Sequence, residues 1–135
     1  YASATSNVDN DGDDYFAVVS STIAAVDNFA NGDYNGFGTT EWSSQIDVGS
    51  ISTGAYNDFV LNATGIGNIN KTGDTVLGLR EGHDILDSSV TAGSGGNSMT
   101  SKFRANAGVS TSPRLEIIHS AGAAATFIPR ITIIT

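Results

Sequence analysis

Cysteine is absent from the chain, which excludes a disulfide framework and a thiolate metal site. Long apolar runs are missing too: none approaches the roughly 20 residues that a transmembrane helix needs, so we expect no membrane span. The 135 residues are enough for one domain that buries its own core. Because the chain begins at Tyr1 and not at methionine, we expect a processed fragment or a piece of a longer polypeptide.

Basic side chains are missing from the first half of the sequence. Residues 1–70 carry nine acidic side chains and no Lys or Arg, residues 71–135 carry six basic and five acidic ones, and the net charge is −8. We expect no nucleic-acid partner, because phosphates are bound by clustered Lys and Arg. An acidic half is compatible with divalent cations, with attraction between neighbouring copies, or with a merely soluble surface.

The usual catalytic and nucleotide-binding motifs are absent as well. The sequence has no Gly-x-Ser-x-Gly, no His-Glu-x-x-His and no Gly-x-x-x-x-Gly-Lys-Ser/Thr. Its two imidazoles are His83 and His119. His83 stands in LREGHDILD, which favours either a polar pocket or a surface network of salt bridges. Its charged neighbours there are Arg80, Glu81, Asp84 and Asp87. No nucleophile or spaced acid pair stands out, so we expect no enzymatic activity.

What the sequence does contain is a series of short β-type runs, bounded by Gly, Asn, Asp and Ser. Two segments, 21–34 and 62–73, favour short helices, the second with Thr64 as N-cap and Gly73 as its end. This pattern predicts an all-β fold: an antiparallel β-sandwich or jelly roll with one or two short helices. The predicted strands are Tyr1–Thr5, Tyr15–Ser20, 44–51, Tyr56–Leu61, Thr75–Arg80, Lys102–Ala105, Arg114–His119 and Phe127–Ile134.

The last fifteen residues differ from the predicted sandwich domain of residues 1–120. Residues 121–125 form a linker of small side chains, and the strand FIPRITII that follows is apolar on both faces. Such a strand needs cover on both sides. It can tuck into its own domain, or it can add to the sheet edge of a neighbouring copy. For the second alternative, the predicted assembly residues are Phe127, Ile128, Ile131, Ile133 and Ile134.

The acidic stretch NVDNDGDDYF, residues 7–16, begins like an EF-hand loop. Asn7, Asp9 and Asp11 fill ligand positions 1, 3 and 5, but position 12 is Val18 where a bidentate Glu is needed. An EF-hand is therefore excluded. Two interpretations remain, a looser calcium site at Asp9, Asp11 and Asp13 with oxygens from another loop, and a solvated connector.

Trp42 is the only tryptophan, and Tyr34 is near it in the sequence. Exposed aromatic rings on a β-sandwich can stack on sugar rings, whereas a lone Trp in a small sandwich is commonly part of the core. Trp42 and Tyr34 are therefore the candidate glycan-binding residues, with a core role as the alternative for Trp42.

Two stretches, STGAYNDFVLNATGIGNINKTGDTVLGLREGHD and FRANAGVSTSPRLEIIHS, resemble the DNRLRE-type β-sandwich domains, in the version found in predicted phage and metagenomic virion proteins. The resemblance extends from about Asp13 to Ser120, roughly four fifths of the chain, and the terminal FIPRITII is similar to the short apolar tail of such phage proteins. The matching elements are Gly54–Leu61, Asn62–Ile69, Leu77–Arg80 and Thr111–His119.

The resemblance implies a jelly-roll domain similar to carbohydrate-binding modules, with an adhesive or architectural role and no common catalytic residues. Family members usually carry further strands before the point where this chain begins, and Tyr1–Thr5 would match the end of one of them. If those strands are missing, the resemblance implies an exposed sheet edge that a partner chain, or another segment of the same precursor, completes.

We therefore expect a non-enzymatic structural or adhesive domain of a virion, such as a phage head-decoration or tail-fibre protein, or of a similar extracellular assembly. It would act by packing and strand complementation with other copies of itself or with other structural proteins of the particle. The alternative is a carbohydrate-binding module of a secreted or cell-surface adhesin or filament. No cofactor is expected, calcium being the one ion with a candidate site.

Overall fold

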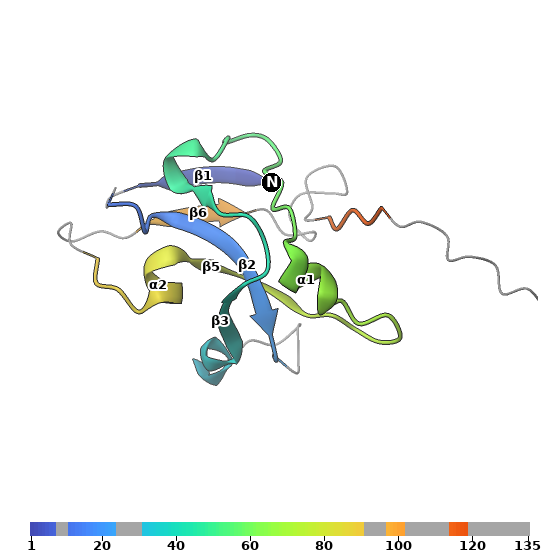
Figure 1. Cartoon of the computed structure of the whole chain (residues 1–135). Helices are drawn as coiled ribbons and strands as arrows, with labels where there is room; N and C mark the ends of the chain where they lie inside the picture. The colour runs from blue at the N-terminus through green and yellow to red at the C-terminus, as the bar shows by residue number, and fades with distance from the viewer. Residues whose placement is uncertain (8–10, 24–30, 91–96, 102–113, 119–135) are drawn as a thin grey trace, which may run out of the picture.

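A computed structural model describes residues 1–7, 11–23, 31–90, 97–101 and 114–118 of the chain (Figure 1). The described residues form short strands, two one-turn α-helices and two 3₁₀ turns. The strands are β1 (Ala2–Ser6), β2 (Tyr15–Ser21), β3 (Phe37–Glu41), β4 (Ile46–Asp47), β5 (Leu77–Glu81) and β6 (Ser98–Ser101). The helices are α1 (Ala63–Gly67) and α2 (Gly82–Leu86), and the 3₁₀ turns are η1 (Asn31–Gly36) and η2 (Val48–Ser50).

Strand β2 is the centre of the larger sheet. It pairs antiparallel with β5 along one edge, and with β3 and β4 along its other edge. A second sheet consists of β1 and β6, also antiparallel. Figure 1 shows β1 and β6 side by side, with β2 and β5 next to them. The prediction of an antiparallel, mostly β fold with short helices is thus confirmed.

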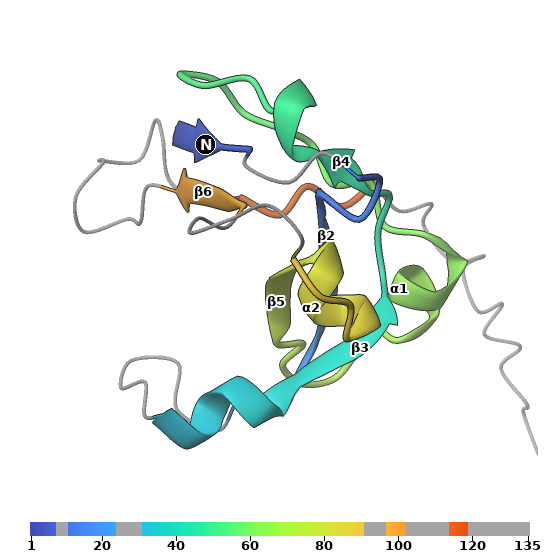
Figure 2. The ribbon, with the colours of Figure 1, turned by 90° about the vertical axis from the view of Figure 1, so that its left-hand side faces the viewer.

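The sequence YFAVVS forms β2 because alternate side chains of a strand point to opposite faces and both faces are apolar here. On one face, Tyr15, Ala17 and Val19 pack with Ile85 of α2 into one buried cluster. Figure 2 shows α2 lying against β2 and β5. Helix α2 therefore covers this face of the sheet.

The other face of β2 meets the second sheet at one end only. Phe16 packs there with Ala2 of β1, and with Val48 and Ile51 around η2, in a second buried cluster. Ile46, Phe59 and Met99 lie against this cluster. Val18, two residues along the same face, belongs to neither buried cluster and is only half-buried.

The predicted helix in residues 62–73 is confirmed but is short. Its N-cap is Asn62, two residues before the expected N-cap Thr64, because the Asn62 side chain accepts a hydrogen bond from the Gly65 N–H at 2.9 Å. Asn68 ends it, well before Gly73. Ile66 remains 62 % exposed on this helix, so α1 does not bury its apolar side chain in the core.

Two of the predicted strands are wrong for the described residues, and a third, 44–51, is a strand only at Ile46–Asp47 because Val48–Ser50 forms η2. Residues 56–61 form no strand beyond an isolated bridge at Leu61. The side chain of Asn57 is the reason: it accepts from the Ser52 N–H at 2.8 Å and donates to the Ser52 carbonyl at 3.0 Å, which replaces ladder hydrogen bonds. Residues 114–118 are all exposed and form no strand either.

Three observed elements were not predicted. Strand β3 was missed because Gly36-Phe37-Gly38 has the composition of a turn, and β6 because SMTS is mostly polar. Helix α2 was missed because GHDIL is a single turn that begins with glycine. The predicted strands at 102–105 and 127–134, and the linker 121–125, lie outside the described residues.

Within the part of the chain that the structure describes, no helix has both the length and the hydropathy that crossing a membrane requires.

Candidate functional site

The acidic loop before β2 is held closed by Asp14. Its side chain is 2 % exposed, accepts from the Asn7 amide at 2.9 Å, and accepts from the Gly12 N–H at 3.1 Å. Asp11 accepts from the Asp13 N–H at 3.0 Å, which forms a tight turn at Gly12, a residue with a φ of 106°. The described part of the connector, residues 11–14, is therefore hydrogen-bonded, and Asp14, a candidate cation ligand in the sequence, is a structural carboxylate there.

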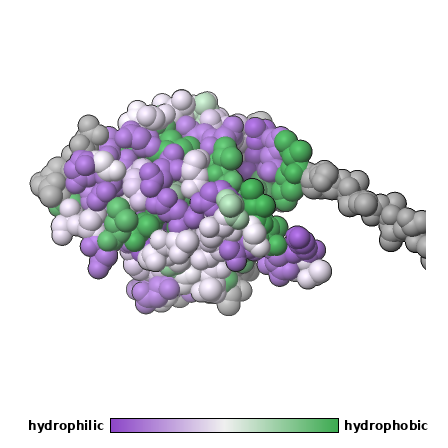
Figure 3. All heavy atoms as spheres, in the orientation of Figure 1, coloured by the Kyte–Doolittle hydropathy of each residue, from purple (hydrophilic) through white to green (hydrophobic). Residues whose placement is uncertain are grey.

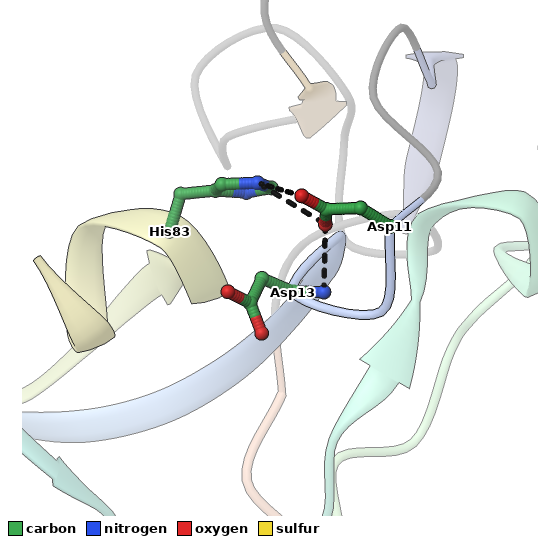
Figure 4. Close-up of side chains that lie close together, drawn as sticks. All are labelled: Asp11, Asp13 and His83. Carbon is green, nitrogen blue, oxygen red and sulfur yellow. Dashed lines mark hydrogen bonds and ion pairs between the residues drawn. The ribbon is translucent and has the colours of Figure 1, made fainter. Parts of the chain in front are cut away.

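His83 of α2 contacts Asp11 of this loop, although the two residues are 72 positions apart in the sequence. The imidazole is 3 % exposed. Its Nδ1 lies 2.8 Å from Glu81 Oε1, and its Nε2 lies 3.3 Å from Asp11 Oδ1. Figure 4 shows the ring reaching from α2 to the Asp11 carboxylate. The hydrogen bond to Glu81, and then the one to Asp11, raise the pKa of His83 against the opposing effect of burial.

The helix that carries His83 is positioned by its own cap and by a glycine. The Glu81 side chain accepts from the His83 N–H at 2.9 Å and so caps α2. Gly82 is buried, and a Cβ there would overlap the carbonyl oxygen of Asp13. Close approach of α2 to the acidic loop therefore requires glycine at this position.

Asp11, Asp13 and His83 form the candidate metal group of the described residues. One ligand atom from each lies within 4.8 Å of the others. An imidazole together with two carboxylates suits a zinc-like ion better than calcium, which prefers oxygen ligands. In the structure Asp13 also accepts from the Ser88 hydroxyl at 2.9 Å, so each of the three side chains is hydrogen-bonded. Asp9 lies outside the described residues, so a calcium site at Asp9, Asp11 and Asp13 stays a prediction.

Arg80 forms the second polar cluster of this region. Its side chain is 10 % exposed, and its Nε lies 2.5 Å from Asp84 Oδ2. Its Nη1 donates to the carbonyls of Phe37 and Gly38 at 3.3 and 3.1 Å. Arg80 thus holds the pKa of Asp84 below its usual range and ties α2 to β3. The salt bridges of LREGHDILD lie on β5 and α2, with Arg80 and His83 only 10 and 3 % exposed, so they do not form the surface network that was one of the two predicted alternatives.

Tyr34 belongs to the Arg80 cluster. Its hydroxyl donates to Asp84, the Arg80 guanidinium lies 5.5 Å from its ring centroid, and 57 % of the side chain is exposed. Trp42 is half-buried and follows β3, and its carbonyl accepts from the Asn62 N–H at 2.9 Å at the start of α1. Tyr34 is therefore the more accessible of the two predicted glycan-binding residues.

A hollow of the described surface lies on the face of the sheet opposite α2. This apolar cleft has a volume of about 1560 Å³ and runs over β2 and β5. Val60, Ile66 and Leu79 line it and are 68, 62 and 38 % exposed. Figure 3 shows apolar surface gathered near α1 and residues 114–118. Other apolar side chains that line it include Val18, Leu77, Met99, Leu115, Ile117 and Ile118.

Sequence reasoning missed the apolar cleft, although one signal was present. Tyr15–Ser20 is apolar on both faces, so the face of Val18 also needs a covering partner. The predicted assembly residues, Phe127, Ile128, Ile131, Ile133 and Ile134, lie outside the described residues.

Comparison with known proteins adds no relative: the chain matches no protein-family model, no curated protein and no solved structure.

Proposed function

We propose that this chain is a non-enzymatic structural subunit of a virion or a comparable extracellular assembly, which packs against other copies of itself or other proteins of the particle. The observation that carries the proposal is the apolar cleft. A cleft lined by several apolar side chains that are more than half exposed is typical of a surface that another polypeptide covers. The resemblance to virion domains of the DNRLRE type supports placing that assembly in a virion.

The two sheets support a sandwich in this proposal. The cluster around Phe16 joins β2 to β1 and η2, as the two layers of a sandwich are joined. The same face is open farther along β2, at Val18 and toward Leu79 of β5. A partner that fills this position completes the second layer, which is how strand complementation would act.

The polar clusters support a structural rather than a catalytic role. His83 lies between Glu81 and Asp11 and contacts both carboxylates. Arg80 donates hydrogen bonds to Asp84 and to carbonyls of β3. The Tyr15 hydroxyl donates to Glu41 at 2.6 Å, and burial together with this bond raises the pKa of Tyr15. These groups hold α2 and the strands in place, and the proposal assigns them no reaction.

The test is the mass of the particles that the full chain forms, measured by light scattering and electron microscopy. Truncation after Gly122 should leave monomers, because it removes the apolar strand 127–134. A full-length control avoids the effect of shortening: Phe127→Ser with Ile131→Ser should also abolish assembly, whereas Thr132→Ser should preserve it. Polymers of unchanged size from the truncated chain would contradict strand complementation.

Glycan binding is the second candidate, and the exposure of Tyr34 favours it. A glycan array probed with the wild-type chain, with Tyr34→Ala and with Trp42→Ala tests this candidate. Binding that is lost in both variants would support a carbohydrate-binding module. No binding, or binding that both substitutions leave unchanged, would rule out this pair as the site.

A further inference from the structure

One face of the paired strands β2 and β5 forms the floor of the apolar cleft. Val18 of β2 and Leu79 of β5 are directly opposite each other in the antiparallel register. Their side chains point to the same face, because opposed residues of neighbouring strands share a face. Leu77 and Met99 extend this floor along the sheets. The floor is thus a continuous apolar surface made by strands, which is the shape that a further extended segment packs on.

The size and charge of the cleft favour a polypeptide segment as its occupant. Pockets for small molecules measure roughly 300–1,000 Å³, and the apolar cleft exceeds that range at about 1560 Å³. Its charged lining residues are two acidic and two basic: Asp58, Glu116, Lys71 and Arg114. A cleft with balanced charge does not attract an acidic segment, which disfavours the nine carboxylates of residues 1–70 as occupants.

Residues 127–134 are the segment of this chain that matches these requirements. Seven of the eight side chains are uncharged, with Arg130 the one exception, and the apolar ones alternate over both faces of a strand. As a strand beside β5, the segment would turn one row of alternate side chains toward the cleft, which Leu79, Val60 and Ile66 line.

The edge of β5 provides backbone partners for such a segment. Among the described residues β5 pairs with β2 alone, so its second edge is free to form a ladder. An added strand there would gain main-chain hydrogen bonds from β5 while its side chains enter the cleft. Within the part of the chain that the structure describes, the cleft therefore offers both an apolar floor and a strand edge with no ladder partner.

The path of the chain favours a donor from another copy. Residues 114–118 form one wall of the cleft, and Ile118 at its end is 92 % exposed. Residues 119–126, HSAGAAAT, contain one serine and one glycine, separated by Ala121, and none of the Pro, Asn or Asp residues that make tight reversals. This composition disfavours a reversal that would bring the segment back onto its own cleft.

We propose that the apolar cleft over β5 accepts residues 127–134 of a second copy of this chain as an added strand. The inference rests on the proposed function, and it identifies the acceptor surface of that assembly. Each copy then carries one donor segment and one acceptor cleft, a head-to-tail arrangement that builds closed rings or open filaments.

Disulfide trapping tests the proposal cleanly, because the chain has no cysteine of its own. We would mix a Leu79→Cys variant with a set of single donor variants, Ile128→Cys, Ile131→Cys and Ile133→Cys, and oxidise the mixture. We expect a cross-linked heterodimer with at least one donor position. The matched control replaces Leu79→Cys by Leu86→Cys, which lies on α2 outside the cleft and is 53 % exposed, and it should yield no specific product.

The outcomes separate this proposal from the proposed function. Polymers that persist while no donor position cross-links to Leu79→Cys would overturn the acceptor cleft and leave assembly standing. A dilute double variant, Leu79→Cys with Ile131→Cys, that closes an intramolecular disulfide in preference to the mixed product would show that the segment covers its own cleft. A full chain that remains monomeric would overturn both proposals.

Charge substitution gives an independent readout. Val60→Lys places a cation in a cleft that must receive Arg130, and we expect at least a tenfold rise in the concentration needed for assembly. Leu86→Lys changes a similarly exposed side chain outside the cleft, and it should leave that concentration unchanged. Equal effects of the two variants would contradict the assignment of the cleft.

Discussion

The two faces of the β2–β5 pair differ in what covers them. On one face, Val19 is 0 % exposed under α2. On the other face, Val18 is half-buried and the neighbouring Leu79 is 38 % exposed in the apolar cleft. In β2 both faces are apolar, so the composition of that strand does not explain the difference. It follows from the position of α2, which the chain supplies to one face and not to the other.

This comparison shows how one strand serves two purposes. The covered face is fixed by many interactions, because α2 is tied to the acidic loop by His83 and to β3 by Arg80. The open face has no helix of the described residues over Val18 and Leu79. We propose that the covered face stabilises the subunit and that the open face binds the next one.

The largest effect on stability is expected where α2 touches the acidic loop. Gly82→Ala puts a Cβ against the Asp13 carbonyl, and displacing backbone of this kind costs about 3 kcal/mol of the free energy of unfolding. Gly67→Ala is the control, since a Cβ there meets nothing within 4 Å in α1. Chemical denaturation of the truncated monomer would measure both, and equal values would show that α2 is not packed as described.

Substitution of neighbouring valines compares the two faces directly. Val19→Ala removes two buried methyl groups and should cost about 2 kcal/mol in the free energy of unfolding of the monomer. Val18→Ala should cost less than about 1 kcal/mol, because that side chain is only half-buried. Urea denaturation of both variants provides the measurement. A larger loss for Val18→Ala would reverse the assignment of covered and open faces.

The contribution of His83 to stability should depend on pH. Its pKa is raised in the folded protein, so its stabilising charge is fully present below the unfolded pKa of about 6.5 and is lost as pH rises through the folded value. The difference in unfolding free energy between wild type and His83→Asn should therefore be larger at pH 5.5 than at pH 9. His119→Asn is the control, and a His83 difference that is independent of pH would show that no charged imidazole bridges the loop.

The smallest effect on subunit stability is expected on the open face. Val60→Lys should change the unfolding free energy of the truncated monomer by less than about 0.5 kcal/mol, because the side chain is 68 % exposed. Its strong effect on assembly, predicted above, would then be separate from folding. A loss of several kcal/mol in thermal or chemical denaturation would mean that Val60 belongs to the core.

Short stretches of sequence predicted the elements that form from contiguous residues. β2 and β5 were found because each is a short run of apolar residues between turns, and α1 because residues 62–73 favour a short helix, although its N-cap is Asn62 and not the expected Thr64. The contact of His83 with Asp11 joins residues that are 72 positions apart, and no local pattern pairs them. The exposure of Val18 could not be predicted from the sequence either, since it depends on where α2 packs. The sequence of β2 carries a signal, not used in its prediction, that both faces need cover, and the arrangement of elements shows which face α2 leaves open.

Hydrogen exchange at β5 tests most directly the claim that the open face is completed by another copy. The backbone amides of residues 77–80 would be followed by mass spectrometry in the assembled full chain and in the chain truncated after Gly122. We predict that truncation speeds exchange in β5, because its second edge loses a paired strand, while exchange in α2 on the covered face stays the same. Identical exchange of β5 in the two chains would contradict the account.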